Sequence, residues 1–512
     1  MLEKLKKGFH KVFNPMTITG ILILIQAVYV WELLFNLTTY SPYISLIITV
    51  GAVIMALYII WRDDNPAYKM GWLMTICLMP ILGALLYLFY GNKRPAKPLI
   101  RKLEPCEKKH RKDLEQTATV EEIECPRLAG ISKYLSKHGP YPAWGNTQTT
   151  YYALGDDAYP RLLADLEKAE HSIFMEYFII SEGEMWHSIF DILKRKAAQG
   201  VDVRLMYDDV GTLPTMPKAF VKELRAAGIK VHAFNPLRPI ISLVYNNRDH
   251  RKMAIIDSYI CHTGGYNLAD EYINKEVRFG HWKDTGLRLE GDAVWNYTVM
   301  FLTMWNAFVP TEESFESFRP HVHHPEAFVG NGGIVQPYSD TPLDEESVGE
   351  NVYLEILNQA KDYTYIFTPY LVIDNEMVTA LSMAAKRGVD VRLVTPGIPD
   401  KKMVFKLTRS YYRPLIKAGV RIYEYTPGFI HAKSFISDDQ VGVVGTINMD
   451  YRSLYLHFEC ATMMIGCEAL KDLKQDCFDT FEKSDEILMA ELNKNFFSIL
   501  FEGLLRALSP MM

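Results

Sequence analysis

Two stretches of the chain, NRDHRKMAIID and FIHAKSFISD, repeat one arrangement of chemically capable residues: His, one residue, Lys, four residues, Asp. Because side chains alternate between the two faces of a β-strand, His250 and Lys252 should lie on one face, and His431 and Lys433 likewise. Each copy therefore offers an imidazole beside a cation, and the duplication indicates a paired site.

The aspartates that end the two copies, Asp257 and Asp438, complete the motif and are grouped with its catalytic residues. Each stands seven positions after its histidine, which puts it on the opposite face of the strand. Each also begins a turn-like pair of residues, DS or DD. We therefore expect both aspartates to shape a hairpin rather than to touch substrate.

A duplicated pair of histidine and lysine suits chemistry at a tetrahedral phosphoryl centre. Each motif is followed by a glycine turn that ends in asparagine, GGYN at Asn267 and GTIN at Asn448. The lysines would neutralise the non-bridging oxygens and the asparagines would donate hydrogen bonds to them, which stabilises charge without a metal. One imidazole can attack phosphorus, and the other, when protonated, can give its proton to the leaving alkoxide. We expect neither a metal ion nor a cofactor.

Histidines in such roles need a partner that fixes their tautomer, usually a carboxylate on the far ring nitrogen. Asp284 in GHWKDTGLRLEG and Glu459 in LHFECATMMI each follow a glycine turn and precede an apolar strand, so they occupy corresponding places in the two copies. We expect them to orient the histidines. The alternative is that both are salt-bridge or turn carboxylates.

The similarity extends beyond the motifs, because further pairs of segments recur in the same order. QGVDVRLM matches RGVDVRLV, and LRAAGIKVHAFNP matches LIKAGVRIYEYTP. Each copy alternates helical spacing with short apolar strands. The sequence therefore predicts an α/β fold: two fused α/β sandwich repeats with mixed sheets and one shared active site between them. The insertion LRPIISLVYN, present only in the first copy, either contacts lipid or packs as a surface loop.

Three apolar runs precede the repeats, Ile18–Phe35, Tyr43–Trp61 and Gly71–Tyr90. Each approaches the roughly 20 residues that a helix needs to cross a bilayer, so at least two of them should be membrane helices. A cleaved signal peptide is the competing interpretation, but no small-residue cleavage site follows the first run. The basic cluster Lys93–Lys112 favours a cytoplasmic main body near anionic headgroups.

These patterns divide the chain into five segments. They are a transmembrane anchor of two or three helices (1–92), a basic juxtamembrane linker (93–149), a first repeat (150–325), a second repeat (326–490) and a C-terminal amphipathic segment (491–512). The last segment either lies on the membrane or packs on the core. The formal net charge of −6 argues against a general nucleic-acid binder, so we expect no nucleic-acid partner. The oligomeric state stays open.

The paired motifs, each followed by a glycine turn and asparagine, resemble the phospholipase D superfamily. Within it the chain is similar to bacterial cardiolipin synthases over essentially its whole length. That narrower resemblance is carried by the segments LYLFYGNKRP, EYFII, TGGYNLADEY, FGHWKDTGLRLEGDAV, QPYSDTPLDEESVGENVYLEIL, GTINMDYRSLYLHFE and RALSPMM.

The resemblance implies a transesterification at the membrane of a bacterial cell. A histidine would attack the phosphodiester of phosphatidylglycerol, glycerol would leave, and a second phosphatidylglycerol would take the phosphatidyl group to give cardiolipin. In much of the superfamily the first-motif histidine is the nucleophile, so His250 takes that role and His431 the acid/base role, although the pseudo-symmetry leaves the reverse open. The second glycine turn departs from the first by carrying Thr446 in place of Gly265, which makes Thr446 a candidate hydroxyl donor to substrate.

The same motifs leave four alternatives to cardiolipin synthesis. A phosphatidylserine synthase of the superfamily would exchange a different headgroup, and a phospholipase D hydrolase would let water finish the reaction. The membrane helices and the acidic balance disfavour a nuclease. Intact histidines, lysines and asparagines in both copies disfavour a membrane scaffold without activity.

Overall fold

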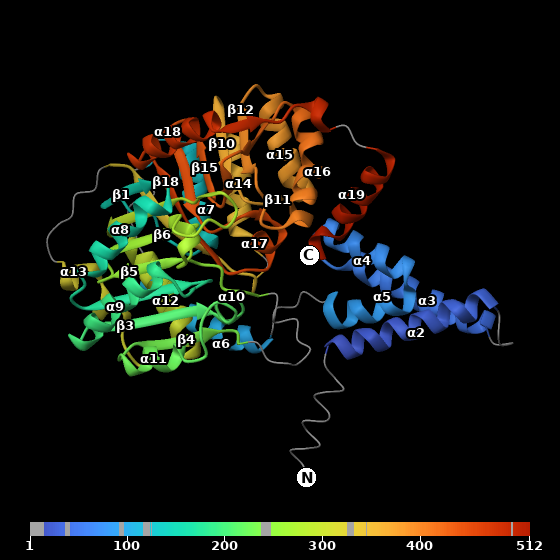
Figure 1. Ribbon diagram of the computed structural model, residues 1–512, viewed down its shortest axis with the longest axis horizontal. Coiled ribbons are helices and arrows are strands. Elements are labelled where there is room, and N and C mark those ends of the chain that lie inside the picture. Colours follow the sequence, from blue (N-terminus) through green and yellow to red (C-terminus); the bar gives the residue numbers. More distant parts are fainter. Residues whose placement is uncertain are drawn as a thin grey trace, which may run out of the picture. The chain divides into compact units, whose positions relative to one another are not determined.

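The computed structural model describes residues 15–35, 41–91, 97–115, 123, 125–236, 247–324, 332–344, 346–492 and 495–511 (Figure 1). The insertion LRPIISLVYN, for which the sequence predicts a lipid-contacting or surface loop, lies outside these residues. The chain forms two compact units. One contains the helices near the two chain ends, and the other, Lys97–Pro236 with Asn247–Asn493, contains both repeats.

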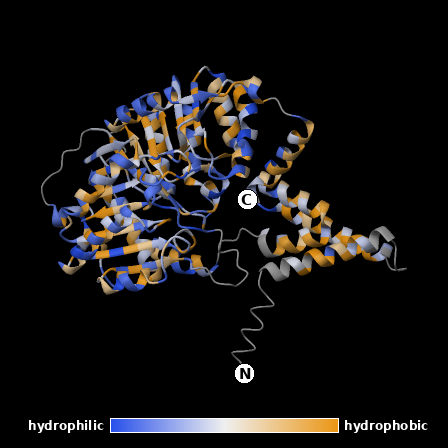
Figure 2. Cartoon of the chain, in the orientation of Figure 1, coloured by the Kyte–Doolittle hydropathy of each residue, from blue (hydrophilic) through white to orange (hydrophobic). Residues whose placement is uncertain are grey.

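The helical unit is strongly apolar (Figure 2). Among the described residues one helix, Pro42–Trp61, is long and apolar enough to cross a membrane by length and composition, and nearly all of it is exposed. Gln26, a polar residue in the first apolar run, accepts a hydrogen bond from the backbone N–H of Leu82 at 3.1 Å, which supplies one of the partners that a helix start lacks. The helices are α2 (Pro15–Phe35), α3 (Ser41–Trp61), α4 (Pro66–Leu78), α5 (Pro80–Leu86), the π-turn η1 (Tyr87–Gly91), α19 (Phe496–Leu508) and η8 (Ser509–Met511).

The third apolar run is not one continuous helix. Helix α4 ends at Leu78, Met79 leaves the helical region with φ −136° and ψ 75°, and Pro80 begins α5. Proline has no N–H to donate and disfavours helical geometry in the residue before it, which explains why the helix breaks at Met79. The number of membrane crossings, two or three, therefore stays a prediction.

The C-terminal amphipathic segment forms α19, whose first turn is capped by Asn495, since its side chain accepts from the N–H of Ser498 at 2.9 Å. Helix α19 contacts α4 in the same unit. Phe496 and Phe497 are nevertheless 72% and 79% exposed. The segment thus packs on the helical unit while Phe496 and Phe497 stay largely exposed among the described residues.

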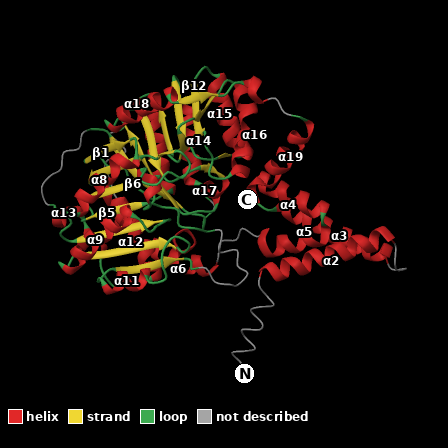
Figure 3. Cartoon of the chain, in the orientation of Figure 1, coloured by secondary structure: helices red, strands yellow, loops and turns green. Residues whose placement is uncertain are grey.

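The first repeat is built on a seven-stranded sheet in the order β1-β8-β6-β5-β2-β3-β4 (Figure 3). Strands β2, β3 and β4 are parallel to one another, and the other pairs are antiparallel, so the sheet is mixed. The strands are β1 (Thr147–Tyr152), β2 (Ser172–Tyr177), β3 (Asp202–Asp208), β4 (Lys230–Phe234), β5 (Met253–Ile256), β6 (Ile260–Gly264) and β8 (Gly286–Gly291).

The second repeat has an eight-stranded mixed sheet in the order β19-β13-β12-β10-β15-β16-β18-β9. Its parallel strands β10, β12 and β13 correspond to β2, β3 and β4, and its hairpin β15-β16 corresponds to β5-β6. The structure confirms the predicted pair of mixed α/β repeats. The strands are β9 (Ile334–Asp340), β10 (Tyr363–Phe367), β12 (Asp390–Pro396), β13 (Arg421–Tyr425), β15 (Ser434–Ser437), β16 (Val441–Gly445), β18 (Glu459–Ile465) and β19 (Ser484–Glu486).

Helices cover these sheets, and one of them joins the repeats. Helix α12 (Val294–Phe308) is buried along almost its whole length and contacts β2, β5, β6 and β8 of the first sheet and β9 of the second. Others are α6 (Lys97–His110), α7 (Pro126–His138), α8 (Gly155–Leu166), α9 (Glu184–Ala198), α10 (Asp209–Thr212), α11 (Phe220–Ala226), α13 (Pro320–His323), α14 (Val348–Gln359), α15 (Asn375–Lys386), α16 (Lys402–Ala418), α17 (Tyr451–Tyr455) and α18 (Ala469–Glu482).

Part of the segment that the sequence assigns to a juxtamembrane linker is folded onto the repeats. Helix α6 contacts α12, and α7 contacts α14. Leu99 and Leu103, one helical turn apart, are buried, whereas Lys102 and Lys109 are exposed. The basic residues of α6 therefore form the solvent face of an amphipathic helix.

Candidate active site

The first histidine is held by backbone contacts with the second repeat. His250 precedes β5, and its backbone N–H donates to the carbonyl of Phe458 at 2.9 Å, while the N–H of Phe458 donates to the carbonyl of Arg248 at 2.9 Å. Phe458 directly precedes β18. The segment that carries His250 is thus paired with the segment that begins a strand of the opposite repeat.

This pairing brings His250 to Glu459. The Nδ1 atom of His250 lies 2.9 Å from both carboxylate oxygens of Glu459, whose side chain is fully buried. A carboxylate can only accept, so the hydrogen stands on Nδ1 and the Nε2 atom keeps its lone pair. This tautomer presents a nucleophilic nitrogen.

The second histidine repeats the arrangement in the opposite direction. A short strand of the first repeat, β7 (His281–Lys283), runs parallel to β14 (Gly428–Ile430) of the second. The backbone N–H of His431 donates to the carbonyl of Lys283 at 2.7 Å, and its Nδ1 atom lies 2.7 Å from Oδ2 of the buried Asp284. Each histidine therefore has its carboxylate on the other repeat.

The two motif lysines are 1% exposed and lie beside the histidines. The Lys252 ammonium donates to the carbonyl of His250 at 2.6 Å. The Lys433 ammonium donates to the carbonyl of His431 and lies 2.8 Å from its Nδ1 atom. Burial lowers the pKa of Lys252 to about 8 and that of Lys433 to about 7, although the nearby carboxylates act in the other direction. Both cations can therefore exchange a proton near neutral pH.

Burial also lowers the pKa of the histidines, to about 3 for His250 and about 4 for His431, because the neighbouring lysines add to desolvation and the carboxylates offset them only in part. Burial alone would raise the pKa of Glu459 and of Asp284, but their histidine partners hold both below the usual range. At neutral pH the empty site thus contains two neutral imidazoles and two ionised carboxylates.

Thr446 contacts Glu459 and Cys460 through its side-chain hydroxyl. Its hydroxyl donates to Oε2 of Glu459 at 2.5 Å and accepts from the backbone N–H of Cys460 at 3.0 Å. At the corresponding position of the first repeat, a Cβ on Gly265 would come within 2.0 Å of Oδ1 of Asp284. The second repeat therefore combines threonine with glutamate, and the first repeat combines glycine with aspartate. In this geometry Thr446 orients Glu459.

The two asparagines differ in their surroundings. The Asn267 side chain accepts from the N–H of Ile179 at 3.0 Å and donates to the Tyr272 hydroxyl at 2.7 Å. The Asn448 side chain is buried, and among the described residues its Oδ1 atom has no hydrogen-bond partner. Asn267 is thus part of a fixed network beside His431, since the Tyr272 ring lies 5.5 Å from that imidazole. Of the Asn448 amide, the oxygen is the atom that is left without a partner among the described residues.

The motif aspartates lie at the far ends of their strands from the histidines. Asp257 follows β5 with φ 50°, and its carboxylate accepts from the backbone N–H groups of residues 170, 171 and 172 at 2.9, 2.8 and 2.7 Å. Asp438 follows β15 with φ 53° and accepts from residues 361, 362 and 363 at 2.8, 2.9 and 2.9 Å. Both carboxylates fix a turn and do not point toward the histidines.

His457 belongs to the site, although the sequence arguments do not single it out. Its ring lies 5.5 Å from that of His250, and its Nδ1 atom lies 3.8 Å from Glu459. Among the described residues neither of its ring nitrogens has a hydrogen-bond partner. Ligand atoms of His250, His457 and Glu459 lie within 4.8 Å of one another. His457 lies in the bend before β18, two residues from Glu459, and no sequence pattern identifies it.

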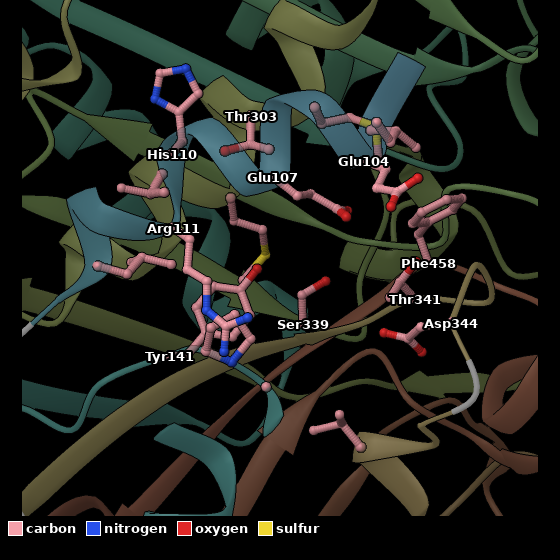
Figure 4. A pocket seen from close by; sticks show the side chains of 18 of the residues that line it. Glu104, Glu107, His110, Arg111, Tyr141, Thr303, Ser339, Thr341, Asp344 and Phe458 are labelled. Carbon is pink, nitrogen blue, oxygen red and sulfur yellow. The ribbon is translucent and has the colours of Figure 1, made fainter. Parts of the chain in front are cut away.

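A cavity of about 270 Å³ lies beside the segments that carry His250 and Glu459, since Arg251 and Phe458 line it. Figure 4 shows its lining. Glu107 of α6, Met300 of α12 and Ser339 line it, together with Arg251 and Phe458. Arg251 stands next to His250 in the chain, and its guanidinium pairs with the buried Glu176 at 2.5 Å and with Asp249 at 3.1 Å. Neither motif histidine lines the cavity. The cavity therefore adjoins the motif strands without opening between the two histidines.

Comparisons with known proteins agree with this architecture. The family model described as "Cardiolipin synthase, PLD-like domain" matches residues 162–279 and 353–480, and "Phospholipase_D-nuclease N-terminal" matches residues 51–92. An uncharacterized protein of Streptococcus mutans is 45% identical over 88% of this chain and 97% of its own length. Cardiolipin synthases of Alkalihalophilus pseudofirmus and Geobacillus thermodenitrificans are 33% and 34% identical, over 92% and 91% of this chain and 94% and 93% of their own.

Among solved structures, the crystal structure of phosphatidylserine synthase from Haemophilus influenzae superposes with a TM-score of 0.56 and 13% identity. It covers 74% of this chain and 97% of that one. This likeness supports the fold. With two matched domains and relatives of such identity over nine tenths of its length, the chain belongs to the phospholipase D-like cardiolipin synthase family.

Proposed function

We propose that this protein is a cardiolipin synthase, which transfers the phosphatidyl group of one phosphatidylglycerol to the terminal hydroxyl of another and releases glycerol. The relatives named cardiolipin synthase support a lipid phosphatidyltransferase of the phospholipase D type. The observation that most supports the chemistry is the crossed pair of histidine–carboxylate bonds, His250 with Glu459 and His431 with Asp284, beside two buried lysines.

In the first half of the proposed reaction, Nε2 of His250 attacks phosphorus. A phosphorus–nitrogen bond forms as the phosphorus–oxygen bond to glycerol breaks, and His431 gives its Nε2 proton to the leaving alkoxide. Lys252 and Lys433 stabilise the charge on the non-bridging oxygens, as does the amide of Asn448. In the second half His431 takes the proton of the incoming hydroxyl, whose oxygen then displaces His250.

This scheme requires a protonated His431, whereas burial and the lysines keep that imidazole neutral in the empty site. The substrate itself supplies the change. A phosphodiester carries one negative charge, and a negative charge within a few ångströms of a histidine favours its charged form. Substrate binding and protonation of His431 are therefore coupled, and the general acid forms where it is needed.

The same proposal includes the location of the enzyme. Helix α3 and the membrane-lipid substrates of the named relatives support attachment to the bacterial cell membrane. We propose two or three crossings and a cytoplasmic catalytic unit, on the basis of the apolar runs and the basic cluster that follows them. Protease protection of inverted and right-side-out vesicles would test this orientation.

Product analysis of the full-length protein, reconstituted with phosphatidylglycerol, tests the activity. We expect cardiolipin and glycerol in equal amounts. Phosphatidic acid as the main product would indicate a hydrolase, and efficient transfer to serine in place of phosphatidylglycerol would indicate a phosphatidylserine synthase. Absence of any product from a folded protein would leave the scaffold interpretation. Variant His250→Ala serves as the inactive control for each product.

A further inference from the structure

Five large apolar side chains of the repeat unit are exposed in three segments that adjoin the motif histidines. The segments are residues 209–216 after β3, residues 274–280 before β7, and residues 397–403 after β12. The exposed side chains are Val210 (38%), Leu213 (59%), Val277 (79%), Ile398 (41%) and Met403 (46%).

The first segment adjoins His250. It begins where β3 ends, and the hydroxyl of Thr212 donates to the carbonyl of Phe178 at 3.2 Å. Phe178 follows β2, and its ring lies 5.1 Å from the His250 ring in an edge-to-face contact. The segment that carries Val210 and Leu213 is thus linked through Phe178 to the proposed nucleophile.

The other two segments adjoin His431 and each other. The backbone N–H of Ile398 donates to the carbonyl of Gly428 at 3.1 Å, and a Cβ on Gly280 would lie 3.0 Å from the Ile398 side chain. The ring of Phe429, next to Gly428, lies 5.8 Å from that of His431. Val277 stands three residues before Gly280 in the chain. These segments therefore border the second half of the site.

Both repeats expose apolar side chains at corresponding places. Strands β3 and β12 are equivalent parallel strands, and the first and third segments follow their carboxyl ends. Exposed apolar side chains grouped around a site, rather than scattered singly, mark surfaces that contact a partner. The duplication places such side chains on both sides of the paired histidines.

Cations accompany these apolar groups. Lys401 and Lys402 are exposed in the third segment, where Asp400 is the only acid, and Lys275 and Arg278 are exposed in the second. Arg278 pairs with Glu271 at 3.1 Å, Lys275 with Glu184 at 3.2 Å and Lys401 with Asp400 at 3.6 Å. The other acids of the segments are Asp209 and Glu276. Among the described residues, Lys402 is therefore the cation of these segments that has no ion-pair partner. Apolar side chains beside lysines fit the surface of an anionic bilayer.

We propose that residues 209–216, 274–280 and 397–403 form a lipid-contacting rim, which holds the side of the repeat unit that carries the two histidines against an anionic phospholipid bilayer. The apolar side chains enter the interface and the lysines meet the headgroups. A phosphodiester then reaches the histidines while its acyl chains stay in the lipid. The rim deepens the proposed function and depends on it for the identity of the substrate, but its contact with lipid can be measured without turnover.

A photo-crosslinking experiment tests the contact. Val277 is replaced by p-benzoylphenylalanine in the full-length protein, which is reconstituted in bilayers rich in phosphatidylglycerol and illuminated. The matched control is Val322, 56% exposed on α13. That helix lies at the other end of the sheet, since the neighbouring His323 stacks on His171, whose backbone N–H is bound by Asp257. We expect phospholipid adducts by mass spectrometry at position 277 and not at position 322.

Equal adduct yields at the two positions would overturn the rim, even if the protein makes cardiolipin. Adducts at position 277 in a protein that makes no cardiolipin would support the rim and reject the proposed function. The two ideas can therefore fail separately.

A second measurement compares turnover on substrate in a bilayer with turnover on monomeric substrate. The triple variant Leu213→Ser, Val277→Ser, Met403→Ser is compared with Val322→Ser after each is shown to unfold at the wild-type temperature. The ratio of turnover on bilayer phosphatidylglycerol to turnover on monomeric short-chain phosphatidylglycerol should fall by about tenfold or more, because burial of apolar side chains drives the contact. An unchanged ratio would contradict the rim.

Discussion

Glu459 of the second repeat accepts a hydrogen bond from Nδ1 of His250 of the first repeat at 2.9 Å, and the bond is bidentate. Asp284 of the first repeat accepts from Nδ1 of His431 of the second through Oδ2 alone, at 2.7 Å. Neither repeat contains a complete pair of histidine and carboxylate. The site therefore requires both repeats, packed in one fixed orientation, and this explains why the two copies share a buried helix between their sheets.

Replacement of Glu459 by glutamine should abolish most activity without unfolding the protein. The Thr446 hydroxyl donates to Oε2 of Glu459, so the glutamine would keep its carbonyl toward Thr446 and turn its amide N–H₂ toward His250. That amide favours a lone pair on Nδ1 and a hydrogen on Nε2, which is the wrong tautomer for attack. We expect a fall in kcat of about 10²- to 10⁴-fold, as seen when a histidine loses its orienting carboxylate.

The control for this variant is Thr446→Val, which removes the orienting hydroxyl but keeps the carboxylate. It should lose much less activity than Glu459→Gln. Cardiolipin formation and thermal unfolding are measured for both variants. Equal losses in the two variants, or wild-type activity in Glu459→Gln, would show that the carboxylate does not set the tautomer of His250.

Binding of an anionic phosphodiester should take up protons at neutral pH. In the empty site the pKa of His431 is lowered to about 4 and that of Lys433 to about 7, so at pH 7 the imidazole is neutral and the lysine is partly protonated. A bound anion raises both pKa values, and the complex then holds more protons than its separated components. The measurement is titration calorimetry with a phosphonate analogue of phosphatidylglycerol in buffers of different ionisation enthalpy.

Variant His431→Ala isolates the contribution of this histidine, because the two motif lysines would then supply the uptake. We expect less uptake in this variant than in the wild type at pH 6 to 7. Release of protons on binding, or uptake that is identical in the variant, would argue against protonation of His431 by the substrate.

The two histidines should differ in their ability to form a covalent intermediate. Because a nucleophile must itself form the bond to phosphorus, His250→Ala should trap no label from radiolabelled phosphatidylglycerol. His431→Ala lacks the general acid and should also lose steady-state synthesis. It should still accumulate phosphatidyl-enzyme from a phosphatidyl ester of nitrophenol, whose leaving group needs no proton, since acid/base help contributes only about 10²- to 10⁴-fold.

Label on His431 in the His250→Ala protein, with none on His250 in the converse variant, would reverse the two roles and leave the chemistry unchanged. Absence of label in every variant with the activated ester would instead contradict a covalent intermediate.

Several features of the site were predictable from sequence because they are local. The alternation of strand side chains pairs each histidine with its lysine, and the duplicated segments predict two mixed sheets. The partner of His250 was not predictable, since 209 residues separate it from Glu459 and only the packing of the two repeats brings them together. Sequence correspondence pointed to the two carboxylates but not to their crossed pairing.

Other features escape the sequence patterns for local reasons. Hydropathy does not show that the apolar run that contains Pro80 is divided into two helices at the proline, and whether this run crosses a membrane stays a prediction. Basic composition predicts a linker where α6 lies, because the count of lysines conceals Leu99 and Leu103 on its buried face. His457 stands alone in the sequence, and only its distance from Glu459 shows that it belongs to the site.

Metal chelation should leave the activity intact, since lysines and an asparagine supply the charge and the donors for the phosphoryl step. Added Zn²⁺ should inhibit, because His250, His457 and Glu459 offer three ligand atoms within 4.8 Å and a bound ion would occupy the proposed nucleophile. His457→Ala should raise the Zn²⁺ concentration required for half-inhibition. Complete loss of activity in EDTA, restored by one specific metal, would contradict this account of the site.

The last prediction separates a structural from a catalytic role for Asp257. Its Oδ1 atom accepts from residues 171 and 172, and its Oδ2 atom accepts from residue 170. Asp257→Ala leaves three backbone donors without partners, and each lost partner costs about 1 to 3 kcal/mol when buried, so a large fall in the unfolding temperature is expected. Asp257→Asn keeps Oδ1 and tolerates the positive φ of 50°, so it should destabilise the protein much less.

We expect the stability of the Asp257 variants to follow the number of backbone hydrogen bonds that remain, while the folded fraction of each variant keeps its kcat. The matched position in the second repeat, Asp438, provides an internal replicate, because its carboxylate accepts from three backbone N–H groups in the same division between Oδ1 and Oδ2. The opposite pattern, in which Asp257→Asn unfolds at the wild-type temperature but loses kcat, would place this aspartate in the chemistry despite its position at the far end of β5.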